Sequence, residues 1–337
     1  MHPSSTPNRS GRSRRSVLAA AASAGVVGLA GCTGGGSSSR DVVASFFTFY
    51  DFARQITAET PITVENLVPV GLHGHGWDPD PTVTRDIIEA DAFVHVGEDF
   101  QPWADRAIQT VRDDGAETHL VNSRAGVDLV DLADTAEEDE QVSDGKDPHF
   151  WLDPARAKVA VDNIETGLAT VYPEQEGTFA ANAETLRGEL DELDEEWQAV
   201  FDAAERDVVF LAAHNAFEYI GQRYGASVRP LVTNLAATDD VRPADRRRAQ
   251  ETIAEYDIRY IGAAIFEPRR PAQRLLEDTA VEAYYPVTPY AGTREEWVDR
   301  GWGYFEIARQ INLPTFEIVL GARTPTEAAM GEWRNFE

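Results

Sequence analysis

The chain has 337 residues, more than one hydrophobic core usually serves, so two lobes or domains are expected. Hydrophobic residues make up 42% and aromatic residues 9%, which excludes a disordered chain. Acidic residues outnumber basic ones by 58 to 30, and the net charge of −28 would repel a phosphate backbone, so no nucleic-acid partner is expected. Only Lys146 and Lys158 are lysines. This composition favours a halophilic protein that stays soluble in concentrated salt over an ordinary acidic protein.

The first 31 residues are predicted to be an export signal. A basic region without acidic residues precedes a short apolar stretch, Val17 to Ala30, which is too short for a relaxed membrane-spanning helix. Arg14 and Arg15 lie in Ser-Arg-Arg-Ser-Val-Leu, which resembles a twin-arginine signal for proteins exported already folded. Leu-Ala-Gly-Cys, ending at Cys32, resembles a lipobox, in which the cysteine thiol is lipidated. Because Cys32 is the only cysteine, an internal disulfide and a multi-cysteine metal site are excluded.

Short apolar runs then alternate with helical patterns, which predicts parallel sheets covered by helices. In the first half, strands are expected at 42–47, 64–69, 92–96 and 118–121, with helices at 83–90 and 102–111. In the second half, strands are expected at 208–212, 227–231, 259–265 and 283–287, with helices at 216–223, 243–256, 271–282 and 295–312. The fold class is therefore α/β, with two lobes that each hold a mostly parallel sheet flanked by helices.

One uninterrupted helical pattern, from about Pro173 to Arg206, separates the two series. Its apolar residues recur at spacings of four and three and form one stripe: Phe179, Ala183, Leu186, Leu190, Leu193, Trp197 and Val200. At 1.5 Å per residue this helix would be roughly 50 Å long, and we expect a strut packed along both lobes rather than a coiled-coil arm. The expected organisation is an export signal at 1–31, a Gly/Ser tether at 32–40, an N-terminal lobe at 41–170, a long linking helix at 171–206, a C-terminal lobe at 207–325 and a tail at 326–337. The acidic stretch 131–146 is expected to be a solvated loop.

Four histidines stand where a predicted strand gives way to a loop or helix, the edge at which open α/β sheets bind ligands. They are His73, His75, His149 and His214. His95 and His119 fall inside apolar strand patterns, where buried histidines with satisfied hydrogen bonds are expected. Converging neutral imidazoles suit a borderline-soft divalent cation. The spacing of these histidines fits a shared metal site and four unrelated histidines equally well, because no short motif links them.

Several segments, in this order, resemble the metal-binding solute-binding proteins of ABC importers, the zinc and manganese group with a rigid helical connection between lobes. His-Gly-Trp-Asp-Pro at 75–79 resembles the family's His-x-aromatic-acidic-Pro segment. Asp-Pro-His-Phe-Trp-Leu-Asp-Pro at 147–154 is similar to the signature of its second ligand, and 214–219 resembles its third-ligand segment. Phe-Glu-Pro at 266–268 is similar to its glutamate segment. The similarity extends from about Asp41 to Ala322.

The resemblance implies a metal site in the cleft between the lobes. Its implied ligands are His75, His149 and His214. Many members have a further aspartate ligand where this chain has Thr288, which leaves the fourth position open among Glu267, His73 and a water molecule. Glu267 could instead pair with Arg269 or Arg270.

A histidine in the third ligand position favours zinc over the harder manganese, so Zn²⁺ is the expected cargo and Mn²⁺ the alternative. The resemblance also implies an exported, monomeric binding protein, held at the outer face of the cell membrane by a lipid on Cys32. It would deliver the ion to an ABC permease and its ATPase, and it would not be an enzyme.

Three other functions stay open at this point. A zinc hydrolase would use three histidines with Glu267 or Glu218 as its base. A binding protein for a metal chelate or a tetrapyrrole would need a wide aromatic cleft, for which the chain offers Trp77, Trp103, Trp151, Trp297 and Trp302. A surface adhesin or a metal chaperone could share the same fold.

Overall fold

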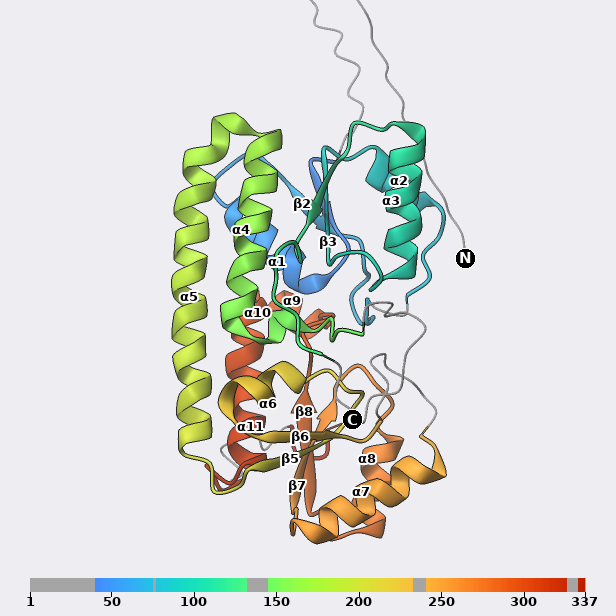
Figure 1. The fold of residues 1–337 in the computed structure, drawn as a ribbon, viewed down its shortest axis with the longest axis vertical. Coiled ribbons are helices and arrows are strands. Elements are labelled where there is room, and N and C mark those ends of the chain that lie inside the picture. The colour runs from blue at the N-terminus through green and yellow to red at the C-terminus, as the bar shows by residue number, and fades with distance from the viewer. Residues whose placement is uncertain (1–39, 75–76, 132–144, 233–240, 326–332, 337) are drawn as a thin grey trace, which may run out of the picture. The chain divides into compact units, whose positions relative to one another are not determined.

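The computed structural model describes residues 40–74, 77–131, 145–232, 241–325 and 333–336 (Figure 1). The predicted export signal, nearly all of the tether and most of the acidic loop therefore lie outside the described residues. None of the helices in these ranges is both long and apolar enough to span a membrane.

The first lobe is built on a four-stranded parallel sheet. Its strands are β1 (Val42–Ala44), β2 (Val64–Asn66), β3 (Ala92–His95) and β4 (His119–Asn122), in the order β2-β1-β3-β4. Alternate residues face opposite sides of the sheet. Val42 and Ala44 join the core that contains helices α1 (Phe47–Ile56) and α4 (Pro154–Val171). Val43 joins a second core with α2 (Thr82–Ile88) and α3 (Pro102–Asp114), so helices cover both faces, as in other parallel sheets.

The second lobe repeats this winding. Its strands are β5 (Val208–Ala212), β6 (Ser227–Pro230), β7 (Tyr260–Ala264) and β8 (Ala283–Val287), all parallel and in the order β6-β5-β7-β8. Its helices are α6 (Glu218–Tyr224), α7 (Pro243–Glu255), α8 (Arg270–Asp278) and α11 (Leu313–Val319). Because the strands are parallel, their carboxyl ends meet at one edge, and the loops that leave β5 and β7 are neighbours there.

The predicted long helix is present as α5 (Glu176–Asp202), preceded by a 3₁₀ turn at Pro173–Gln175. Its 27 residues correspond to a length of roughly 40 Å, shorter than expected. All seven residues of the predicted apolar stripe are buried. The helix packs against α1 and α4 of the first lobe and against α6 and α11 of the second, so it contacts both lobes as predicted (Figure 1).

The structure corrects the predicted helix at 295–312. It is interrupted between α9 (Glu295–Asp299) and α10 (Tyr304–Ile307), and a π-helical turn (Ala308–Asn312) then leads into α11. Within the interruption, Gly301 takes a left-handed conformation with φ +70°. Gly303 then approaches α1 so closely that a Cβ there would lie 2.5 Å from the carboxylate of Asp51. That buried carboxylate accepts a hydrogen bond from the Tyr304 N–H at 2.9 Å.

One further difference concerns the strand histidines. His95 is buried as expected, but its Nδ1 has no hydrogen-bond partner among the described residues, and His119 is only half-buried.

Residues 333–336 pack onto the second lobe. Asn335 exchanges hydrogen bonds with the backbone of Tyr284 in β8, and Phe336 is buried.

Candidate metal centre

His149 is held by the turn that precedes α4. Asp147 Oδ1 accepts hydrogen bonds from the backbone N–H of His149 at 2.9 Å and from its Nδ1 at 2.8 Å. Both side chains are 1% exposed. A carboxylate acceptor places the ring proton on Nδ1, which leaves the Nε2 lone pair available. Nε2 of His149 is buried and has no hydrogen-bond partner within the described part of the chain.

His214 is held in a similar way by the second sheet. It follows β5, and Glu267 follows the neighbouring strand β7, so the parallel pairing brings the two side chains together. Glu267 Oε1 lies 2.5 Å from Nδ1 of His214, and Nε2 of this histidine is likewise buried without a hydrogen-bond partner in the described ranges. Each lobe therefore supplies a carboxylate-oriented imidazole, an arrangement typical of metal-binding histidines.

The two lobes bring these imidazoles together. The ring centroids of His149 and His214 are 5.5 Å apart, and those of His73 and His214 are also 5.5 Å apart. His75, the first ligand implied by the sequence, lies outside the described residues. Among the residues that are described, no group of three or more His, Cys, Asp or Glu side chains forms a ready metal site. The described geometry is therefore a pair of oriented imidazoles with His73 beside it.

The surroundings keep His149 uncharged. Burial lowers its pKa below the usual 6.5, and the nearby His214 lowers it further, while Asp147 opposes the shift. The neutral imidazole that results is the form that binds metals. Trp151 and Phe100 pack against the ring, with centroids 5.4 Å and 6.0 Å from it, and form an apolar wall.

The fourth-ligand candidates occupy distinct positions. Glu267 contacts Nδ1 of His214, the ring nitrogen on the side away from Nε2. Thr288 is engaged in its own turn, where its Oγ1 accepts a hydrogen bond from the Tyr290 N–H at 3.1 Å. Asn312 fixes the backbone of Thr288 by accepting from its N–H at 2.9 Å and donating to its carbonyl at 2.8 Å.

Sequence reasoning missed Asp147 and did not anticipate the contact of Glu267 with His214. The signal for Asp147 was available, because it precedes His149 by two residues within the Asp-Pro-His motif, where a carboxylate can reach both the backbone and the ring of that histidine. The contact of Glu267 with His214 spans 53 residues and depends on the strand order.

Hydrogen bonds also tie the first-lobe loop around His149 to the second lobe. The Tyr219 hydroxyl donates to the carbonyl of Asp147 at 2.7 Å and accepts from the Val130 N–H at 3.2 Å. The indole N–H of Trp151 donates to the Pro289 carbonyl at 2.7 Å. The loop that carries His149 is thus positioned by both lobes.

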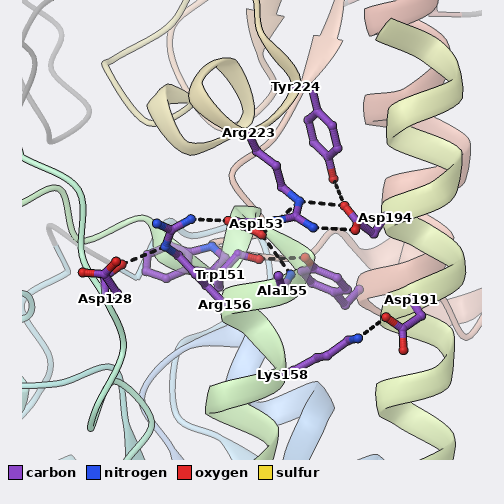
Figure 2. A network of polar contacts seen from close by, with 11 residues as sticks. Asp128, Trp151, Asp153, Ala155, Arg156, Lys158, Asp191, Asp194, Arg223 and Tyr224 are labelled. Atoms are coloured by element: carbon purple, nitrogen blue, oxygen red, sulfur yellow. Dashed lines mark hydrogen bonds and ion pairs between the residues drawn. The ribbon is translucent and has the colours of Figure 1, made fainter. Parts of the chain in front are cut away.

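Figure 2 shows a polar network on the other side of this loop. Asp153 is fully buried, and it caps α4 by accepting from the Ala155 N–H at 2.9 Å. Its carboxylate pairs with Arg156 of α4 and lies 3.4 Å from Nε of Arg223 in α6. Arg223 also binds Asp194 of α5 at 2.5 Å. The network therefore joins the first lobe, the long helix and the second lobe.

The tryptophans are distributed through the interior. Trp103, Trp151 and Trp297 are buried, and Trp77 and Trp302 are partly buried. Trp77 packs on Trp103 at 5.1 Å, and Trp297 on Trp302 at 6.2 Å. These positions fit core packing rather than the lining of a wide aromatic cleft.

Comparison with known proteins gives concordant matches. The family model "Zinc-uptake complex component A periplasmic" matches residues 42–315. The "Zinc-binding protein AdcA" of Streptococcus pyogenes serotype M6 is 28% identical over 291 residues, which cover 82% of this chain and 55% of that protein. The "High-affinity zinc uptake system protein ZnuA" of Bacillus subtilis is 25% identical over 274 residues, 80% of this chain and 84% of that protein. The chain thus spans about half the length of the AdcA relatives.

Solved structures show the same fold. The metal-dependent lipoprotein YcdH of Bacillus subtilis has a TM-score of 0.69 and 24% identity, over 83% of this chain and 98% of that one. The Zn(II)-bound ZnuA-like domain of Streptococcus pneumoniae AdcA has a TM-score of 0.69 and 23% identity, with the same coverage. Since the family model spans both lobes and the segments that carry His149, His214 and Glu267, the chain belongs to the family of the periplasmic component A of zinc-uptake complexes.

Proposed function

We propose that the protein is the extracytoplasmic solute-binding component of an ABC importer. It captures one divalent metal ion, Zn²⁺, between its lobes and delivers it to a membrane permease and its ATPase. The observation that carries this proposal is the pair of buried Nε2 atoms on His149 and His214, each on an imidazole oriented by a carboxylate and each supplied by a different lobe. Imidazole nitrogens are ligands that Zn²⁺ prefers. The names of the AdcA and ZnuA relatives, which refer to zinc binding and zinc uptake, support the same cargo.

In the proposed site, zinc is bound by His75, His149 and His214. The first of these comes from the sequence resemblance alone. Glu267 orients His214 through Nδ1, so the fourth position belongs to His73 or to a water molecule. A histidine donor set without an aspartate at position 288 disfavours the harder Mn²⁺.

Little lobe movement is expected on binding. The long helix α5 packs on both lobes, and hydrogen bonds from Trp151 and Tyr219 already connect them. A rigid connection of this kind favours a small closure over a wide hinge motion. Release would then require the permease to separate the lobes.

The decisive test is calorimetric titration of the chelator-stripped protein with zinc and with manganese. We expect tight one-to-one zinc binding and much weaker manganese binding. His149→Ala should lower zinc affinity by more than the roughly 10–100-fold that loss of an outer-shell partner produces. The matched control is His119→Ala, on the half-buried strand β4, which should bind zinc like the unchanged protein. Zinc affinity unaffected by His149→Ala would contradict the proposed site.

We further infer that residues 1–31 direct export through the twin-arginine route and that a lipid on Cys32 anchors the halophilic, haloarchaeal protein at the outer face of the cell membrane as a monomer. The Streptococcus pneumoniae relative named "Zinc-binding lipoprotein AdcA" supports the anchor. Cys32→Ala should move the protein from the membrane fraction to the medium in a fractionation and immunoblot experiment. A variant that stayed with the membranes would count against the lipobox.

A further inference from the structure

The second lobe contains a cavity that is lined by none of the described histidines. It lies beside α7 and α8, where the chain leaves β6 at Leu231 and enters α8 at Arg270 and Pro271. Its volume is about 370 Å³, within the range of small-molecule sites. Two of its lining residues, Leu231 and Leu275, are almost fully buried and give it an apolar floor.

The charged lining of this cavity is unusual for such an acidic chain. It includes Arg246, Arg270 and Arg274, against the single carboxylate of Asp278. Many other arginines are paired; Arg187 and Arg309, for example, each contact three carboxylates. Among the described residues, the side chains of the three cavity arginines form no ion pair, hydrogen bond or aromatic ring contact. Within the described part of the chain, the cavity lining therefore carries three positive charges against one negative charge, in a protein of net charge −28.

We propose that this cavity binds a small organic anion with at least two carboxylate or phosphate groups on a short carbon skeleton. Guanidinium groups bind both kinds of oxyanion through paired N–H donors, and three of them on two helices can hold two separated acidic groups. The first turn of the nine-residue helix α8, at Arg270 and Pro271, adds the positive end of a helix dipole. The apolar floor formed by Leu231 and Leu275 would contact the carbon skeleton of the anion. This site is independent of the proposed metal capture.

The test is calorimetric titration of the full chain with three probes, at the lowest salt concentration that preserves its melting temperature. Tricarballylate supplies three carboxylates on a carbon skeleton, 1,3-propanediol bisphosphate supplies two phosphates on one, and inorganic phosphate has no skeleton. We expect one-to-one binding of at least one organic probe, tighter than that of inorganic phosphate. The comparison of the two organic probes identifies the preferred acidic group.

Arg246→Gln and Arg274→Gln should each weaken the preferred probe by about tenfold or more, because each removes charge-assisted hydrogen bonds. The matched control is Arg247→Gln, which removes the same charge from an exposed position of α7 outside the cavity lining and should change affinity less than twofold. His149→Ala should also leave anion binding unchanged. Absence of binding by both organic probes, equal losses in all three arginine variants, or loss in His149→Ala would each overturn the proposal.

Discussion

The carboxylate of Asp147 offers a graded test of how the metal centre is built. Its Oδ1 accepts from the backbone N–H of His149 at 2.9 Å and from Nδ1 at 2.8 Å. Asp147→Ala removes both acceptors, whereas Asp147→Asn keeps an oxygen acceptor and removes the negative charge. Loss of such a partner typically costs 10–100-fold in metal affinity. We expect Asp147→Ala to weaken zinc binding by about 100-fold, or ~2.7 kcal/mol. Asp147→Asn should weaken it by about tenfold, or ~1.4 kcal/mol.

The assay is competition calorimetry against a zinc chelator of known affinity. Because Asp147 opposes the burial that lowers the pKa of His149, removing its charge leaves this ring neutral. The loss of zinc affinity should therefore be the same at pH 6.5 and pH 8, which separates an orienting role from a change in protonation. Asp131→Asn, which alters an exposed carboxylate paired with Lys146, is the control and should have no effect. Zinc binding by Asp147→Ala that matched the unchanged protein would refute the reasoning.

Two further predictions concern stability. Tyr219→Phe removes the hydroxyl that joins Asp147 to the second lobe and leaves a buried carbonyl without its donor, so urea denaturation should show a loss of about 2 kcal/mol. Tyr260→Phe, which removes an exposed contact with Glu282, should cost less than about 1 kcal/mol, and equal losses would contradict the interlobe role. Burial lowers the pKa of His95 from 6.5 to about 4, so between these values the unfolded chain takes up a proton that the folded chain does not. Above pH 6.5 this histidine does not lower the free energy of unfolding, and at pH 5 it should lower it by about 2 kcal/mol. The free energy of unfolding, measured by urea denaturation, should therefore fall less between pH 7.5 and pH 5 in His95→Phe than in the unchanged protein, by about 2 kcal/mol. An equal fall in both proteins would contradict the lowered pKa of His95.

Strongly buried elements were predictable from the sequence. The strands at 208–212 and 283–287 have the predicted boundaries, because a strand covered on both faces is a continuous apolar run that ends where polarity returns. The stripe of α5 was likewise fully predictable from its helical spacing. The helix α1 was not expected, because its aromatic residues continue the apolar run of β1 without a break in pattern.

Features that depend on tertiary contacts were not predictable from local pattern. The interruption at 300–303 follows from the close approach of Gly303 to Asp51, a residue 252 positions away. The partner of Glu267 follows from the adjacency of β5 and β7, which composition and spacing do not specify. The histidines were recognisable from a motif, and the spacing of Asp147 from His149 also carried a signal, whereas the contact of Glu267 with His214 emerged only from the folded arrangement.

The buried carboxylate of Asp153 has a consequence for how the chain can be divided. It is supplied by the first lobe, yet Arg223, from α6 of the second, lies against it, and that arginine is held in turn by Asp194 of the long helix (Figure 2). A fragment that ended at residue 170 would lose Arg223 and expose the apolar face that α5 covers. We therefore expect the two lobes to unfold together, and chimaeras that exchange one lobe between relatives to keep this aspartate–arginine–aspartate set intact.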